Sequence, residues 1–212
     1  MIGESSSQMA LRDPHIRLML RVRDDDDDAA FAEIVELYHQ RLVVVLNHLI
    51  GNAAEAEDLA QEVFLRIYRS RTKYHPRAKF CTWLFAIANN LALNFLRDRV
   101  RKQMIPLNLR DSGPLGPRPA EQMVHDRGRQ PPQAMQQQEL AAVVQKALET
   151  LNERQRVAVV LNKFEDMSYE EIALIMGLTT KGVKSLLCRA RENLRLALQD
   201  YIQMEQQEDI DD

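Results

Sequence analysis

Four polar side chains and one tryptophan are spaced so that they could bind unpaired nucleotides. At 100° per residue, Trp83, Asn90, Asn94, Arg97 and Arg101 fall on one side of a predicted helix, opposite an apolar stripe. An indole ring offers a flat surface on which a base can stack, amides can pair with its exposed edge, and guanidinium groups bind phosphates. The alternative is that Trp83 is half-buried for packing alone and that the asparagines are ordinary surface residues.

A second group of side chains lies in a segment typical of a helix-turn-helix, the motif that places one helix in the major groove of duplex DNA. Ser168 and Glu171 can cap a first helix, Gly177 allows a turn, and Thr179 or Thr180 can cap a second helix. The apolar positions of this second helix leave three side chains pointing away from the stripe: Lys181, Ser185 and Cys188. A plain helical hairpin with solvated lysines and arginines is the alternative.

A third group, on the predicted helix before Trp83, indicates a protein partner. Asp58, Gln61, Glu62 and Leu65 share one arc of that helix, opposite its apolar side. Carboxylates and an amide can pair with basic side chains of a partner while the leucine supplies dry contact area. A merely solvated acidic face is the alternative.

Composition favours a helical protein of two small domains. The chain has 212 residues, 45% of them hydrophobic, and a formal net charge of -3. The charge is segregated, since Asp98 is the only acid between residues 66 and 102. No apolar run approaches the ~20 residues that span a bilayer, so we expect a cytoplasmic protein without membrane insertion. Cys81 and Cys188 are expected to be reduced thiols, because they lie far apart in sequence.

Helical periodicity and turn signals place these side chains in an all-α chain. Four helices are predicted at 14–23, 29–50, 52–71 and 82–102, the second capped by the aspartate run at 24–28. Pro and Gly then accumulate in a segment that predicts a flexible linker. The predicted boundaries are a first domain at 12–102, a linker at 103–138, a helix-turn-helix domain at 139–200 and an acidic tail at 201–212.

Three segments together resemble the extracytoplasmic-function group of bacterial RNA polymerase sigma factors. Residues 55–69, EAEDLAQEVFLRIYR, resemble the second-region helix that docks on the clamp helices of the polymerase. Residues 82–99, TWLFAIANNLALNFLRDR, resemble the promoter-melting helix. Residues 151–173, followed by a turn and KGVKSLLCRAR, are similar to the fourth region. The order and spacing of the segments, with a Pro-rich linker between them, make the joint match specific.

This resemblance implies a role for each group of residues. The core polymerase would bind Asp58, Gln61, Glu62 and Leu65. Unpaired bases and phosphates of the minus-ten element would meet Trp83, Asn90, Asn94, Arg97 and Arg101. The duplex minus-thirty-five element would meet Thr180, Lys181, Lys184, Ser185 and Arg189. The resemblance also implies an initiation subunit without catalytic chemistry, cofactor or metal, which an anti-sigma factor holds in check.

Two positions depart from the family pattern, and two other functions stay open at this point. Gly182 stands where the family usually has a hydroxyl, at an expected cost of about 1 kcal/mol within a helix, and Leu186 replaces an arginine. A stand-alone helix-turn-helix repressor or activator would not need the acidic helix face. A metal-dependent hydrolase would rest on His39, His48 and His75, which lack the spacing of a metal motif.

Overall fold

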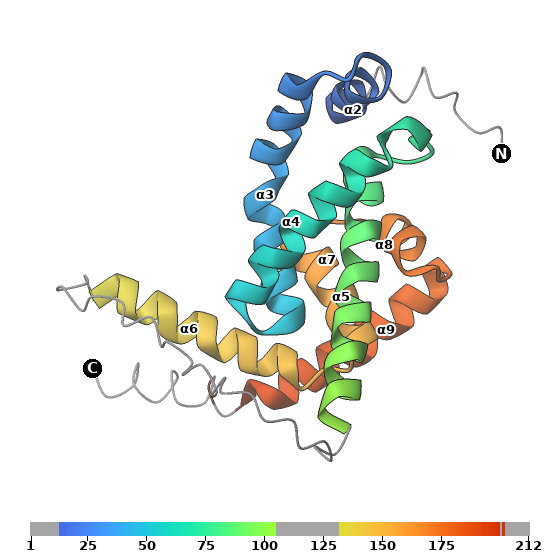
Figure 1. Ribbon diagram of the computed structural model, residues 1–212. Coiled ribbons are helices and arrows are strands. Elements are labelled where there is room, and N and C mark those ends of the chain that lie inside the picture. The colour runs from blue at the N-terminus through green and yellow to red at the C-terminus, as the bar shows by residue number, and fades with distance from the viewer. Residues whose placement is uncertain (1–12, 105–131, 200, 202–212) are drawn as a thin grey trace.

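The computed structural model describes residues 13–104, 132–199 and 201, and all regular elements among them are helical (Figure 1). The all-α prediction is therefore confirmed. The first unit holds α2 (Pro14–Asp25), α3 (Asp28–Ile50), α4 (Ala53–Arg69), the 3-10 turn η1 (Arg71–Lys73) and α5 (Phe80–Met104). The second unit holds α6 (Pro132–Glu149), α7 (Glu153–Phe164), α8 (Tyr169–Met176) and α9 (Thr180–Ala197). None of the helices in the described part of the chain is long and apolar enough to cross a membrane.

The aspartate run ends one helix and begins the next. α2 continues to Asp25, beyond its predicted end, and Asp26 then takes a left-handed conformation with φ 49°. Asp27 caps α3, as predicted, by accepting a hydrogen bond from the Ala30 N–H at 2.9 Å. Three of the carboxylates also accept hydrogen bonds from arginines, in the pairs Arg23–Asp24, Arg71–Asp26 and Arg21–Asp27. The run is thus a bonded junction between helices.

α5 begins at Phe80, two residues before the predicted start at Thr82. Its first backbone N–H, that of Phe80, donates to Asp13 Oδ2 at 2.9 Å, a partner that lies far away in the sequence. The other oxygen of Asp13 accepts from the His15 N–H, also at 2.9 Å, and so caps α2. One carboxylate therefore holds two helix N-termini together.

The predicted linker at 103–138 is too long at both ends. α5 reaches Met104, and α6 begins at Pro132. Proline is tolerated in the first turn of a helix, and the glutamine, alanine and methionine residues that follow it are good helix formers. Residues 105–131 of the predicted linker and 202–212 of the predicted tail lie outside the described residues.

Both units contribute to one continuous hydrophobic core. The centre of the first unit includes Tyr38, Phe80 and Phe85, all at most 1% exposed, and the second unit adds Ile172 and Val183 to the same cluster. α8 packs against α5, and α7 packs against α3. Figure 1 shows α7, α8 and α9 beside the first unit, with α8 next to α5.

Polar contacts accompany this packing between the units. They join Lys79 Nζ to Glu171 Oε1 at 2.9 Å, Arg41 Nε to Glu165 Oε2 at 3.1 Å, and Arg156 Nη1 to the Leu49 carbonyl at 3.0 Å. Burial works to raise the pKa of the Glu171 carboxyl, but hydrogen bonds from Lys79 and Ser168 hold that pKa below its ordinary value. The helix-turn-helix unit is therefore docked on the first unit.

Candidate nucleic-acid and partner surfaces

The helix-turn-helix has the geometry that its sequence predicts. Ser168 and Glu171 form a reciprocal capping box at the start of α8, and Gly177 ends that helix at φ 63°. Thr179 caps α9 by accepting from the Gly182 N–H at 3.1 Å. Val183, Leu187 and Ala190 are buried. This orientation exposes the side chains predicted to meet duplex DNA, which are Thr180, Lys181, Lys184, Ser185 and Arg189.

Two details of α9 refine the prediction. Arg189 bends back along the helix, because its Nη2 lies 3.2 Å from Ser185 Oγ and its Nε donates to the Ser185 carbonyl at 3.3 Å. The two side chains therefore present one combined polar surface. Leu186 is half-buried and packs against the core, so it adds apolar packing where an arginine would have offered a charge.

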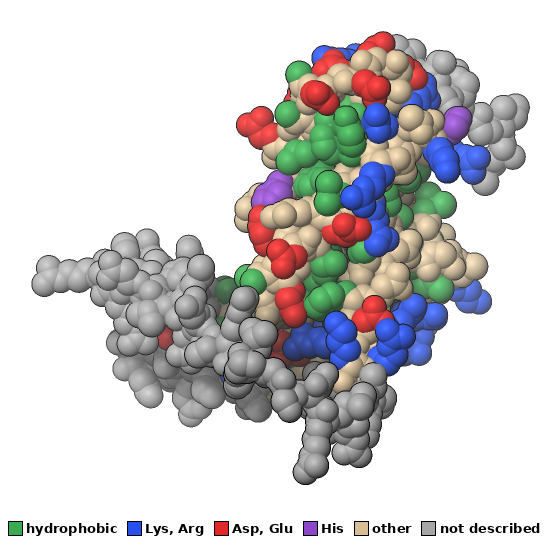
Figure 2. All heavy atoms as spheres, viewed as in Figure 1, with side chains coloured by type: hydrophobic (Ala, Val, Ile, Leu, Met, Phe, Trp, Pro, Cys, Tyr) green, Lys and Arg blue, Asp and Glu red, His purple; other side chains and the backbone are tan. Residues whose placement is uncertain are grey.

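The predicted single-strand face of α5 is exposed over most of its length. Asn90, Asn94, Arg97 and Arg101 are exposed, whereas Trp83 is half-buried. The Trp83 ring packs 4.7 Å from the ring of Tyr74, measured between centroids. In Figure 2, Lys and Arg side chains gather toward the C-terminal half of α5, and Asp and Glu side chains lie over α4 beside it.

Trp83 combines core packing with an accessible site. It lines a pocket of about 470 Å³ at the start of α5, which we call the aromatic pocket. The other lining residues are Lys73, Tyr74, His75, Arg77, Ala78, Thr82, Ala86 and Leu174. Tyr74 contributes a buried hydroxyl that has no hydrogen-bond partner among the described residues. Burial raises the pKa of Tyr74, so that hydroxyl stays protonated and can donate a hydrogen bond.

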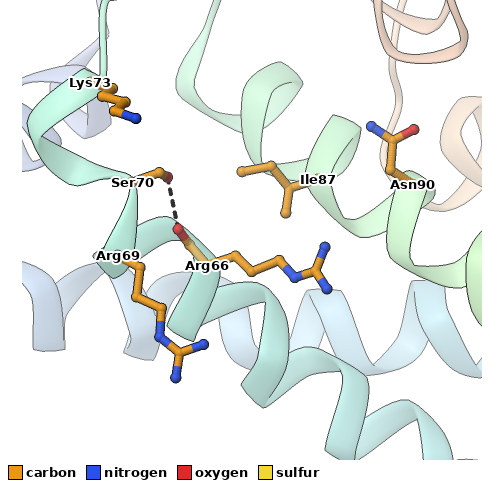
Figure 3. A pocket seen from close by; sticks show the side chains of 6 residues that line it. All are labelled: Arg66, Arg69, Ser70, Lys73, Ile87 and Asn90. Carbon is orange, nitrogen blue, oxygen red and sulfur yellow. Dashed lines mark hydrogen bonds between the residues drawn. The ribbon is translucent and has the colours of Figure 1, made fainter.

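A second hollow lies next to the aromatic pocket, and we call it the basic groove. It has a volume of about 430 Å³ and is lined by Arg66, Arg69, Ser70, Lys73, Ile87 and Asn90 (Figure 3). Lys73 lines both hollows, which makes them neighbours. Sequence reasoning included Asn90 but missed Arg66 and Arg69. The available signal was the spacing of three cations, two at the end of α4 at positions 66 and 69 and one in η1 at position 73.

The acidic face predicted on α4 is accessible to a partner. Asp58, Gln61 and Leu65 are exposed, and the Leu65 side chain is 48% exposed despite being apolar. Glu62 is half-buried and accepts a hydrogen bond from Arg66 Nε at 2.8 Å. We call these four residues, from Asp58 to Leu65, the docking face.

The three histidines considered for a metal site lie apart, each with a different neighbour. His39 Nε2 is 2.9 Å from Glu57, His48 Nδ1 is 3.0 Å from Gln145 Oε1, and His75 Nδ1 is 2.9 Å from the Lys73 carbonyl. Among the residues that the structure describes, no three His, Cys, Asp or Glu side chains come together as metal ligands would. This arrangement does not favour the hydrolase hypothesis.

The chain is similar to known proteins in both of its units. The model of Sigma-70 region 2 matches residues 34–102, and that of Sigma-70, region 4 matches residues 141–194. The ECF RNA polymerase sigma factor SigW of Bacillus subtilis (strain 168) is 35% identical over 182 residues, which are 85% of this chain and 94% of SigW.

Two solved structures have a similar fold. The sigma factor RpoE of Bartonella quintana, in complex with the anti-sigma factor NepR, superposes with a TM-score of 0.58 at 25% identity. The superposition covers 80% of this chain and 96% of RpoE. CnrH, in complex with the cytosolic domain of CnrY, superposes with a TM-score of 0.63 at 21% identity, covering 86% and 96% of the two chains.

Proposed function

The chain belongs to the extracytoplasmic-function group of RNA polymerase sigma factors, and we propose that it divides promoter recognition among the surfaces described above. It is a sigma factor that directs transcription initiation. The observation that carries the proposal is that each surface lies within, or largely within, a segment that a family model matches. The docking face and the single-strand face lie within residues 34–102, and α9 lies largely within 141–194.

The docking face binds core RNA polymerase in this proposal. Asp58 and Glu62 supply carboxylates to basic side chains of the polymerase, Gln61 supplies an amide, and Leu65 supplies apolar area. Leu65 is exposed among acidic residues, so a partner that covers it removes apolar area from water, which favours binding.

The start of α5 and its polar face capture unpaired bases of the minus-ten element. A flipped base stacks on Trp83 in the aromatic pocket, Asn90 and Asn94 pair with base edges, and Arg97 and Arg101 bind backbone phosphates. Binding of each captured base offsets part of the cost of unstacking it, which is on the order of a few kcal/mol. Melting then follows from tighter binding to the open strand than to the duplex, without nucleotide hydrolysis.

α9 recognises the duplex minus-thirty-five element. Lys181, Lys184 and Arg189 bind mainly phosphates, which set the position of the helix, while Thr180 and Ser185 approach base edges. The protein carries no catalytic chemistry of its own in this proposal. It acts with the polymerase in the cytoplasm, under an anti-sigma factor of the kind seen with RpoE.

Run-off transcription with purified core polymerase and fragmented genomic DNA tests this function. We expect discrete transcripts that depend on the protein. The double substitution Asp58→Arg and Glu62→Arg should lower core binding at least tenfold, because it opposes like charges. The matched control reverses two exposed acids on α3, Glu33→Arg and Glu36→Arg, and should keep core binding. Binding to a promoter duplex without polymerase, together with no transcript, would instead identify a stand-alone regulator.

A further inference from the structure

Four cations form a stripe along the whole length of α9. Lys181 and Lys184 lie in its first turns, and Arg191 and Arg195 lie in its last turns. All four side chains are exposed. At 100° per residue they fall within an arc of about 80°, so they line one side of the helix. We call these four residues the basic track.

The positive charge of the basic track is poorly compensated within the described part of the chain. No acid there forms an ion pair with Lys181 or Lys184. Arg191 donates to the Tyr169 hydroxyl at 3.3 Å, which leaves its charge unpaired. Arg195 lies 3.6 Å from Glu192, but the two side chains are 76% and 62% exposed, so this pair is weak. The track therefore offers free cations to an anionic ligand.

The residues that follow α9 carry the opposite charge. Residues 202–212, IQMEQQEDIDD, lie outside the described residues and contain no Lys or Arg. We call them the acidic segment, after Glu205, Glu208, Asp209, Asp211 and Asp212. Blocks of like charge of this kind are often interaction segments.

The acidic segment is tethered at one end of the basic track and is long enough to follow it. Tyr201 joins the segment to the end of α9. Its eleven residues span about 36 Å when extended, at about 3.3 Å each. α9 has 18 residues and is about 27 Å long. The segment can therefore run back along the helix to its first turn.

The C-terminal end of α5 is the other basic surface that the acidic segment could bind. Acids already lie beside its cations, because Arg99 is 3.6 Å from Glu55 and Arg101 is 3.4 Å from Asp98. The basic track also has the advantage of the short tether, which sets a high effective concentration of the segment beside α9. Charge and connectivity thus favour α9.

We infer that the acidic segment binds the basic track of α9 in place of DNA phosphates and competes with duplex DNA for this helix. The inference rests on the proposed function of α9 and adds a regulation to it. Carboxylates and phosphates bind the same ammonium and guanidinium groups, so the segment must leave before a phosphate can take its place. The apparent duplex affinity is then reduced to the fraction of chains whose track is free.

A spin label tests the contact in the full chain. Cys188 is exposed and lies within the arc of the basic track, and Cys81→Ser leaves it as the single thiol. A nitroxide on Cys188 should broaden the backbone amide signals of residues 205–212 in about 50 mM salt and not in about 0.5 M salt, where charges are screened. The control places the nitroxide at the end of α5 by Val100→Cys, in a chain without the other two thiols, and should leave these signals sharp. Val100 is 48% exposed.

Fluorescence anisotropy with a labelled duplex of mixed sequence tests the competition, without polymerase. Truncation after Tyr201 should tighten binding about tenfold in about 50 mM salt and less than about twofold in about 0.5 M salt. Glu208→Gln with Asp209→Asn should tighten it about threefold at the lower salt concentration. Glu33→Gln with Glu36→Gln is the matched control, because it removes the same charge from exposed positions on α3 and should change binding little.

Three results would overturn the inference. They are broadening from the label at position 100 but not from Cys188, equal tightening from the acidic-segment and α3 variants, or a gain on truncation that is as large in high salt as in low salt. The function test is separate from these results. Normal transcription without these effects removes the inference alone, whereas a segment that binds the track in a chain that directs no transcript removes the proposed function and leaves the contact.

Discussion

Tyr74 lines the aromatic pocket and carries a buried hydroxyl that lowers stability as long as nothing accepts its hydrogen bond. The group is buried and has no hydrogen-bond partner in the described part of the chain. An unsatisfied buried donor costs roughly 1–3 kcal/mol. Because this oxygen is out of reach of solvent in the free protein, a base stacked beside Trp83 meets it only when side chains of the pocket shift, and the bond would then turn part of that cost into affinity for the open strand.

Tyr74→Phe should therefore separate stability from function. We expect the free energy of unfolding to stay the same or rise by up to about 1 kcal/mol, because the substitution removes an unsatisfied group. Open-complex formation should fall about three- to tenfold, as measured by permanganate reactivity of promoter thymines. Tyr68→Phe is the control, since Tyr68 lies outside the pocket and its hydroxyl contacts Asp28 at 3.4 Å. Equal losses in both variants would contradict this role of Tyr74.

Gly182 shows how a residue can be judged wrongly from its neighbours in sequence. A glycine within a helix predicts a cost, but Gly182 lies in the first turn of α9, where its N–H bonds to the capping hydroxyl of Thr179. A Cβ at this position would lie 3.3 Å from that oxygen, closer than most such contacts. Glycine keeps space for the cap, so the expected penalty of about 1 kcal/mol overstates its cost.

At the scale of elements, local signals predicted the helices and some of their caps, while distant contacts decided other boundaries. Asn152 and Ser168 stand next to the helices that they cap, so their sequence pattern was sufficient. The start of α5 could not be predicted in this way, because its capping carboxylate is on Asp13, 67 residues earlier. The basic groove was missed for a related reason, since it forms only when α4 and η1 meet α5.

Asp13→Ala should show how much one carboxylate contributes at two helix starts. We expect unfolding free energy to fall by about 2 kcal/mol, because each lost cap costs about 1 kcal/mol. Urea unfolding followed by circular dichroism measures the change. Asp25→Ala removes an exposed aspartate at the end of α2 and should change stability by less than about 0.5 kcal/mol. Asp13 would not be a double cap if the two variants were equally stable.

At the scale of the whole molecule, the contact between the units includes a buried acid. The Glu165 side chain is 4% exposed, whereas its partner Arg41 is 45% exposed. Burial raises the pKa of Glu165 above its ordinary value, although Arg41 opposes the shift. The folded chain therefore binds a proton on Glu165 more tightly than the unfolded chain does. The contribution of Glu165 to stability decreases as pH rises from the ordinary pKa of a glutamate to the raised pKa of the folded state.

Arg41→Met should expose this dependence. At pH 7 we expect a loss of about 1–3 kcal/mol, less than for a fully buried pair because Arg41 is partly in water. The loss should shrink as pH falls below 7, because Glu165 can then take up a proton. Adding Glu165→Gln should restore stability at pH 7 and remove the pH dependence. Thermal unfolding across this pH range measures both effects, and a pH-independent loss would exclude Glu165 as their source.

The docked arrangement of the two units also has a consequence for activation. The minus-ten and minus-thirty-five elements lie about 25 base pairs apart, or about 85 Å along B-DNA at about 3.4 Å per pair. A compact chain of this length is only about 45 Å across. In the proposed function, the units would therefore have to part before α5 and α9 could occupy one promoter together. Molecules in the docked state would then not bind the promoter. The apparent promoter affinity would equal the affinity of the undocked state multiplied by the fraction of molecules in that state.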